Sequence, residues 1–435
     1  MKNFRVLIPL CAAVTLSVAH AQERPYAFVG GKVITVTGDT FDPGSLVVQR
    51  GKIVAVGALD RVRIPNNADR FDATGKIVMP GLVDTHNHNG GIGGGDRSGP
   101  IQPDARVMDS INVLDPGFRR VVAGGLTTIN IMPGSGHLLS GQTIYVKMRG
   151  GKTIEDIAVR DADGEIMGGM KMANGTNSRR DPPFPGTRAK SAALVRERFI
   201  KAQEYRDKIR RAAGDPDKMP PRDIGLEALV EVLEGKRIVH HHTHRHDDIM
   251  TVIRLSKEFG FKVVLHHVSE GWKVADEIAK AGVPCSIILV DSPGGKLEAL
   301  NVAFKTGGVL ERAGVLVAFH TDDWITDSRL FMRTAALGVR AGMTRTGALK
   351  ALTINGAKML GLEGRIGSLE PGKDADVIVL SGDPFSVYTK VEQTWVEGKK
   401  VFDRSDPRDH LYAVGGYGAG SDLKPSLCCF DDGGQ

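Results

Sequence analysis

Short apolar segments alternate with amphipathic segments through the middle of this 435-residue chain, and this alternation limits its fold more than any other feature. The apolar segments have the length of buried strands, and the segments between them have helical periodicity. Successive strand ends lie about 30 residues apart, which is the size of a strand–helix unit. The strands are expected at Leu126–Met132, Met170–Ala173, Arg237–His242, Lys262–His267, Cys285–Val290 and Val315–Phe319, and the helices at Asp247–Phe259, Trp272–Ala281, Leu297–Ala313 and Ser328–Ala341.

Repeated strand–helix units form parallel sheets, and a run of roughly 270 residues fits the length of a (β/α)8 barrel. We therefore predict an α/β fold with a TIM barrel over residues 81–360. Both ends of the chain differ from this middle, because residues 26–80 and 375–403 consist of short strands between turn dipeptides such as Gly-Gly and Asp-Pro. They predict a small β-sandwich domain built from both termini, with residues 22–80 and 361–404 as its two parts.

The first 21 residues have the features of a cleavable signal peptide. Lys2 and Arg5 precede an apolar run, Val6–Val18, which is too short to span a bilayer and is followed by the Ala-x-Ala pattern of Ala19–Ala21. We therefore expect an exported protein, periplasmic or secreted, without a membrane anchor. At the other end, residues 405–435 are rich in glycine and are expected to form an extended tail. The sequence leaves the formation of homo-oligomers open.

Composition argues against two classes of function. The chain has 57 Lys and Arg residues against 51 Asp and Glu residues, and the resulting charge of +6 is small for this length. Because no basic run is interleaved with aromatic residues, we do not expect a nucleic-acid partner. Only 6% of the residues are aromatic, which argues against a carbohydrate-binding or adhesive module.

The histidines carry the main functional signal. Eleven of the 13 lie between residues 86 and 320, and most of these stand where an apolar segment ends. Carboxyl ends of parallel barrel strands meet at one face, so side chains at these ends would converge on a shared divalent-metal site. An aspartate at such an end needs a cation to offset its burial. Four strand ends supply these candidates: His86 and His88; His240, His242 and His244; His266 and His267; and Asp322.

Three motifs make the sequence similar to the amidohydrolase superfamily of metal-dependent hydrolases. Residues 79–88, MPGLVDTHNH, match the opening P-G-x-[IV]-D-x-H-x-H of that family. Residues 125–128, GLTT, resemble its second strand, and residues 364–376, GRIGSLEPGKDAD, resemble the segment that returns the chain to the small β-domain. The resemblance covers about residues 26–403. It points to an exported branch similar to imidazolonepropionase and to zinc dipeptidases of the prolidase type.

The resemblance implies a site for one or two divalent ions. Zn²⁺ is expected, with Mn²⁺, Fe²⁺ or Co²⁺ as alternatives. Lys171 falls where binuclear members carry a carbamylated lysine between two ions, and an ordinary exposed lysine is the alternative. The implied ligands are His86 and His88 from the first strand, His242 from the fifth, His267 from the sixth and Asp322 from the eighth, with His240 and His244 as competing choices for the fifth strand.

The resemblance also implies a reaction. A metal-activated water would attack the carbonyl carbon of an amide, and Asp322 would take the water's proton and deliver it to the leaving nitrogen. The metal, His267 or His137 would polarise the carbonyl oxygen. Arg179, which follows the predicted fourth strand, and His244 are further candidates for contact with the substrate, although a surface position is an equal alternative for Arg179.

We therefore expect a hydrolase of carbon–nitrogen bonds that acts on a small-molecule amide or dipeptide. A periplasmic dipeptidase or N-acyl amino-acid hydrolase fits the predicted export, and an imidazolonepropionase-like cyclic amidase is the alternative within the same chemistry. A non-catalytic exported metal-binding protein is the alternative from another class, but such a protein has no need of Asp322 as a proton shuttle. Relatives have Gly-Glu-Asn where Gly175–Asn177 stand here, so one carboxylate of the relatives is missing.

Overall fold

The computed structural model describes residues 24–93, 95–289, 296–323 and 325–415. The predicted signal peptide at residues 1–21 lies outside this part of the chain, as do residues 416–435 of the predicted tail. Among the described residues, no helix combines the length and the apolar character that crossing a bilayer requires.

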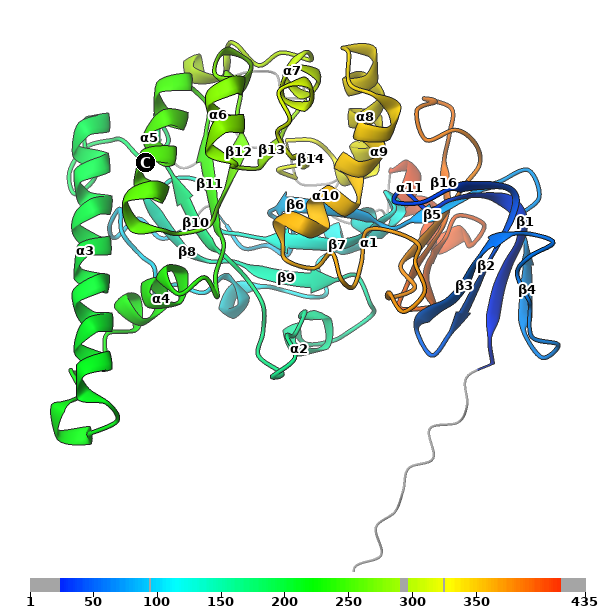
Figure 1. The fold of residues 1–435 in the computed structure, drawn as a ribbon, viewed down its shortest axis with the longest axis horizontal. Helices are drawn as coiled ribbons and strands as arrows, with labels where there is room; N and C mark the ends of the chain where they lie inside the picture. The colour runs from blue at the N-terminus through cyan, green and yellow to red at the C-terminus, as the bar shows by residue number, and fades with distance from the viewer. Residues whose placement is uncertain (1–23, 94, 290–295, 324, 416–435) are drawn as a thin grey trace, which may run out of the picture.

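Strands from both ends of the chain form one sheet at one end of the molecule (Figure 1). β5 from the N-terminal part pairs antiparallel with β15 from the C-terminal part, where Val78 lies opposite Val379. Apolar residues of these strands, among them Phe28, Val377 and Trp395, form a core of their own. Both termini thus build one sheet, as the sequence predicts, while its layering as a sandwich stays a prediction. The order is β17-β16-β15-β5-β1-β2-β3 with β4 beside β1, and the strands are β1 (Tyr26–Ile34), β2 (Thr40–Gln49), β3 (Lys52–Ala58), β4 (Asp69–Asp72), β5 (Ile77–Pro80), β15 (Val377–Leu380), β16 (Val391–Val396) and β17 (Lys399–Asp403).

A second set of strands occupies the middle of the chain. β6 pairs in parallel with β7, and β10 to β14 pair in parallel in chain order. β8 and β9 follow one another and run antiparallel to β10 and β7, and the sequence pattern did not reveal them. An isolated parallel bridge between Asn87 and Asp323 joins the end of β6 to the chain after β14. These strands are β6 (Leu82–Asn87), β7 (Leu126–Ile131), β8 (Leu139–Gln142), β9 (Ile144–Lys147), β10 (Met170–Ala173), β11 (Val239–Thr243), β12 (Val263–His267), β13 (Cys285–Ile287) and β14 (Val317–Phe319).

Helices alternate with the central strands and pack against them. α5 shows how the sequence specifies one of them: Ile249, Val252 and Ile253 recur at helical spacing on its buried face, and Gly260 ends it with a left-handed φ of +73°. The α-helices are α1 (Gly117–Ala123), α2 (Ile154–Ile157), α3 (Arg188–Ala212), α4 (Ile224–Leu233), α5 (His246–Phe259), α6 (Ala275–Ala281), α7 (Thr306–Arg312), α8 (Phe331–Arg340), α9 (Arg345–Leu352), α10 (Ile354–Met359) and α11 (Pro407–Val414). Short 3₁₀ helices are η1 (Val107–Ser110), η2 (Pro216–Lys218), η3 (Gly271–Lys273), η4 (Leu297–Ala299) and η5 (Ser328–Leu330).

The predicted continuous helix Leu297–Ala313 is wrong. This segment forms the single turn η4 and, after a break, the shorter helix α7. Two side chains in the first half bind neighbouring loops: Glu298 accepts a 2.7 Å hydrogen bond from the backbone N–H of Thr176, and Asn301 donates to Glu270. Tertiary contacts therefore override the helical pattern at this point.

The predicted extended tail is wrong in its first part, because residues 407–414 form α11. The Asp406 carboxylate caps this helix by accepting a hydrogen bond from the backbone N–H of Arg408, and a proline occupies the first helical position. Arg119 of α1 pairs with Asp409, which holds α11 against the rest of the molecule. The Asp-Pro start is a capping signal that the glycine content of the tail obscured.

Candidate metal centre

The candidate site lies where the central strands end, and strand geometry explains how side chains reach it. Met170 and Met172 in β10 pack into the apolar core, so Lys171 between them faces the opposite side, toward His86. His267 departs from this alternation, because its φ of +69° is left-handed. The rings of both His267 and its neighbour His266 therefore lie near His86, each with its centroid 5.0 Å from that of His86.

The first group of potential ligands joins the ends of β6 and β14. The Nε2 atoms of His86 and His88 lie 3.1 Å apart, and Oδ1 of Asp322 lies 3.2 Å and 2.9 Å from them, respectively. Asp84 holds the two ends together, because its Oδ1 accepts hydrogen bonds of 3.1 Å from the backbone N–H groups of His86 and Thr321. The aspartate of the opening motif therefore serves the architecture of the site.

The second group joins β11 and β12. His242, His244 and His267 are buried, and their potential ligand atoms all lie within 4.8 Å of one another. The rings of His242 and His267 are 4.3 Å apart between centroids. Nδ1 of His244 lies 2.7 Å from the hydroxyl of Ser269, so its Nε2 is the nitrogen left for another partner.

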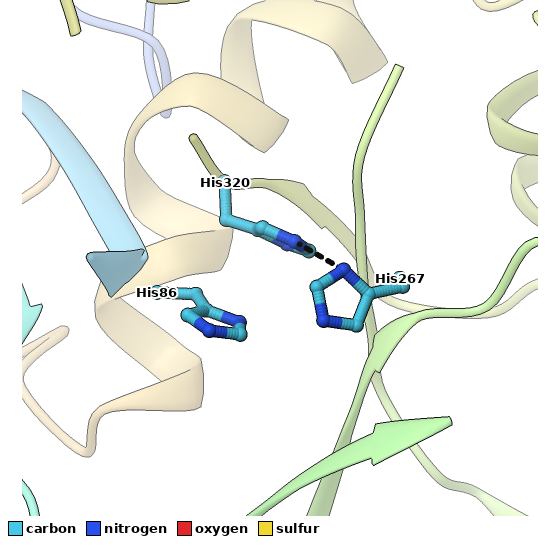
Figure 2. A group of neighbouring side chains, drawn as sticks. All are labelled: His86, His267 and His320. Carbon is cyan, nitrogen blue, oxygen red and sulfur yellow. Dashed lines mark hydrogen bonds between the residues drawn. The ribbon is translucent and has the colours of Figure 1, made fainter. Parts of the chain in front are cut away.

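A third group connects the other two. It consists of His86, His267 and His320, which meet from three separate strand ends (Figure 2). The rings of His86 and His320 stack with centroids 5.0 Å apart, and Nε2 of His320 lies 3.2 Å from Nδ1 of His267. His86 and His267 thus each belong to two groups, so the three groups form one continuous cluster.

Lys171 is buried within this cluster. Its Nζ lies 3.0 Å from Nε2 of His86 and 3.1 Å from Sδ of Met132. Burial lowers the pKa of this lysine to about 7, and the charge of Asp322 offsets only part of that effect. Burial therefore favours the neutral, nucleophilic form of this amine. The alternative of an ordinary exposed lysine is excluded.

Burial keeps the surrounding imidazoles neutral. Removal from water lowers the pKa values of His86, His242 and His267 well below the ordinary value, and neighbouring cationic groups lower them further. Burial raises the pKa of Asp322, but the hydrogen bond from His88 and the positive charge of Lys171 outweigh burial and hold the pKa below its ordinary value. Neutral imidazoles and an ionised carboxylate are the protonation states that bind metal ions.

The donor set fits a divalent cation. Several ring nitrogens are buried without a hydrogen-bond partner: both nitrogens of His242, Nε2 of His244, Nε2 of His267 and Nδ1 of His86. Buried polar atoms without partners are costly, and native proteins rarely keep several together unless a ligand completes them. Imidazole nitrogens with a carboxylate are ligands that suit zinc and related metals.

Backbone strain is concentrated at the same place. His267, Val268 and Asp322 have positive φ angles of 69°, 52° and 51°, a conformation that residues other than glycine rarely adopt. The surrounding structure holds Asp322 there, since its backbone N–H donates a 2.9 Å hydrogen bond to the carbonyl of His86. Such strain is common at functional sites.

Three other residues singled out from the sequence belong to none of the three donor groups. His240 bonds to Tyr145 and His266 at 3.0 Å each and belongs to none of the three groups. His137 packs against Phe184, and Arg179 donates to the carbonyl of Gly175. Neither His137 nor Arg179 is part of the donor groups found in the described chain.

Sequence reasoning gave no role to His320, which the structure brings to the cluster. His320 follows an apolar strand, but the eighth strand end was assigned to Asp322 alone. The positive charge of the exposed Lys296, which no sequence motif marks, also lowers the pKa values of Lys171 and His242.

Comparison with known proteins agrees with this geometry. A family model described as the amidohydrolase family matches residues 162–402, more than half of the chain. The crystal structure of an amidohydrolase from Thermotoga maritima is similar with a TM-score of 0.80 and 33% sequence identity, over 87% of this chain and 100% of that one.

Curated relatives extend the comparison. Amidohydrolase tasK of Hapsidospora irregularis is 29% identical over 83% of this chain, but the match spans only 40% of that longer protein. Two proteins of Symbiobacterium thermophilum are each 26% identical: a 5-methylthioadenosine/S-adenosylhomocysteine deaminase over 81% of this chain and 84% of its own length, and an imidazolonepropionase over 78% and 84%. The chain therefore belongs to the amidohydrolase family and is a hydrolase that acts on carbon–nitrogen bonds.

Proposed function

We propose that this protein is a metal-dependent amidohydrolase that cleaves a carbon–nitrogen bond in a small amide or dipeptide. The observation that carries the proposal is the continuous cluster, in which His86 and His267 are each shared by two donor groups while Lys171 and Asp322 lie against it. We infer that the central strands close into a (β/α)8 barrel, since β8 and β9 link both sheets and the Asn87–Asp323 bridge joins their other edges. The cluster would then lie at the mouth of the barrel.

Two cations would be held by different parts of the cluster. His86, His88 and Asp322 form one set, and His242, His244 and His267 form the other. Zn²⁺ is our first choice, with Mn²⁺, Fe²⁺ or Co²⁺ as alternatives. When bound, such a cation supplies Lewis acidity that lowers the pKa of water and polarises a carbonyl group.

Lys171 would join the two sets as a carbamate. A neutral amine attacks CO₂, forms an N–C bond and releases a proton, so the pKa of about 7 favours this modification at neutral pH. The product would place a carboxylate-like group beside His86, where the structure now has the amine nitrogen at 3.0 Å.

Asp322 would move the proton. Its Oδ1 is engaged by His86 and His88, whereas Oδ2 points toward His267, whose Nδ1 is 3.9 Å away. This distance is too long for a hydrogen bond, so Oδ2 is free to accept a proton from water and to return it to the leaving nitrogen. His137 and Arg179 remain our candidates for contact with the substrate, while His244, the third candidate from the sequence, is assigned here to the second metal set.

Dipeptides and N-acyl amino acids are the proposed substrates, because they fit an exported enzyme of this chemistry. Export rests on the signal-peptide pattern of residues 1–21. The similarity to an imidazolonepropionase favours cyclic amides as the second candidate.

The test combines metal analysis with hydrolysis. Purified mature protein, reconstituted with Zn²⁺ or Mn²⁺, is assayed for metal per chain and for cleavage of dipeptides, N-acyl amino acids and cyclic amides. Asp322→Asn should lower kcat about 10²- to 10⁴-fold, whereas the control Asp327→Asn, which alters a carboxylate outside the donor groups, should not. Lys171→Ala should lower metal content from two ions to one or none. A reconstituted protein with neither metal nor hydrolysis contradicts the proposal.

A further inference from the structure

A series of hydrogen bonds runs from the third donor group away from the site. Nε2 of His320 lies 3.2 Å from Nδ1 of His267, and its Nδ1 lies 2.8 Å from the hydroxyl of Ser286. That hydroxyl lies 2.6 Å from the hydroxyl of Thr85. Thr85, Ser286 and His320, here called the positioning series, are fully buried; Thr85 lies in β6, Ser286 in β13, and His320 directly after β14.

The series constrains which nitrogen of His267 carries a proton. Nε2 of His267 is buried and has no partner, so a proton there would be an unsatisfied donor. A proton on Nδ1 finds an acceptor in Nε2 of His320 at 3.2 Å, and the carboxylate of Asp322 at 3.9 Å is too far to compete. His320 then donates from its own Nδ1 to Ser286, and Ser286 donates to Thr85.

We propose that His320 is a positioning residue which fixes the tautomer and the ring orientation of His267, so that the Nε2 lone pair of His267 faces the metal. Histidines that bind metal commonly donate their second ring nitrogen to such a partner, and loss of the partner lowers metal affinity about 10- to 100-fold. The inference rests on the proposed function insofar as His267 is a ligand. Stacking of His320 on His86 fixes the plane of its ring (Figure 2).

A different role for His320, direct coordination, is less compatible with the contacts. Both of its ring nitrogens are already engaged, by Ser286 and by His267. Nε2 of His267, both nitrogens of His242 and Nε2 of His244 have no such engagement. These unengaged nitrogens can bind an ion without losing a hydrogen bond, whereas coordination by His320 would break its contact with Ser286 or with His267. His320 is therefore the support behind one of them.

The test measures metal affinity and metal number without using activity. Zn²⁺ dissociation constants are determined by competition with a chromogenic chelator, and ions per chain by elemental analysis. The variants are Ser286→Ala, His320→Ala and His320→Gln, whose amide oxygen can still accept from His267. Tyr145→Phe is the matched control, because it removes a buried hydroxyl that lies 3.0 Å from a different histidine, His240.

We expect Ser286→Ala and His320→Ala to weaken Zn²⁺ binding about 10-fold or more at an unchanged number of ions. His320→Gln should restore most of the affinity, and Tyr145→Phe should leave it unchanged. Loss of one whole ion in His320→Ala would instead make His320 a ligand and overturn the positioning role. Unchanged affinity in both alanine variants would also overturn it. A wild-type protein that binds no metal would refute the proposed function itself, and Ser286→Ala keeps the test valid if His320→Ala fails to fold.

Discussion

Two buried lysines have different kinds of partner: one forms ion pairs that stabilise the fold, and the other lies in the candidate metal site. Lys147 in β9 and Lys171 in β10 are 1% and 0% exposed. Lys147 lies 2.6 Å from Asp374, 3.1 Å from Asp376 and 3.2 Å from Glu397. Lys171 has a histidine nitrogen and a methionine sulfur as its hydrogen-bond partners.

The difference in partners reverses the effect of burial. Burial lowers the pKa of both lysines, but at Lys147 the charges of Asp376, Asp374 and Glu397 outweigh it and the pKa is raised. At Lys171 burial prevails and the pKa falls to about 7. Lys147 therefore stays charged and joins the central strands to the terminal sheet, while Lys171 is available as a neutral amine. Both lysines are buried, so burial alone does not distinguish the functional candidate. The feature that distinguishes Lys171 from Lys147 is that Lys171 has no hydrogen bond to a carboxylate.

The largest expected effect is on stability. Lys147→Met removes the shared cation and leaves Asp374 and Asp376 buried without it, so it should lower the free energy of unfolding by about 3–5 kcal/mol. Chemical denaturation at neutral pH measures this loss. Lys52→Met is the control, because Lys52 also pairs with Asp374 but its side chain is 49% exposed, and a loss of at most about 1 kcal/mol is expected there. Equal losses in the two variants would contradict the comparison.

The next prediction is that metal removal destabilises the Lys147→Met and Lys171→Met variants to different extents. With free metal at 100 times its dissociation constant, chelation should lower the free energy of unfolding of the wild type by about 2.7 kcal/mol for each ion bound. Lys147→Met should show the same decrement, because its site is intact, whereas Lys171→Met should lose most of it. Melting temperatures with and without chelator report both quantities. A decrement that survives in Lys171→Met would separate this lysine from metal binding.

The pH dependence of Lys147→Met gives a smaller, graded effect. Lys147 lowers the pKa of Asp374, so that carboxylate stabilises the wild type above its unfolded pKa of about 3.9, and the contribution is lost as the pH falls through its folded value. Burial raises the pKa of Asp376, and removal of Lys147 should raise both values. The difference in the free energy of unfolding between wild type and Lys147→Met should therefore become smaller as both carboxyls become protonated. The decrease is about 1.4 kcal/mol for each unit by which the substitution raises a carboxyl pKa. Denaturation at about pH 7 and about pH 4 tests this, and a gap that widens in acid would refute it.

Lys171→Met should have the smallest effect on the stability of the metal-free protein. Methionine has a similar length to lysine. Lys171 has no hydrogen bond to a carboxylate, so its replacement deprives no carboxylate of a partner. The free energy of unfolding should therefore stay within about 1 kcal/mol of the wild-type value. Denaturation in the presence of chelator measures it. A loss as large as that of Lys147→Met would mean that Lys171 is a structural cation after all.

Much of the site could be predicted from the sequence, since strand alternation is a local property. His86 and His88 were found in this way, Lys171 was implied by the family resemblance, and the structure brings the three together. Alternation alone left the choice among His240, His242 and His244 open, because it places all three on one face, and only the family resemblance favoured His242. In the structure the deepest, His240, bonds to Tyr145 and His266, while the other two enter a donor group.

The sequence by itself determined that His86 and His88 share one face of their strand, because side chains alternate between the two faces of a strand. It did not determine that His320 reaches the cluster or that His267 departs from the alternation. Only the tertiary structure decided that His320 supports His267 and that Lys147 binds Asp374 and Asp376. These contacts join segments that are 53 and more than 200 residues apart. They depend on strand order and register, which long-range packing sets and no local pattern encodes.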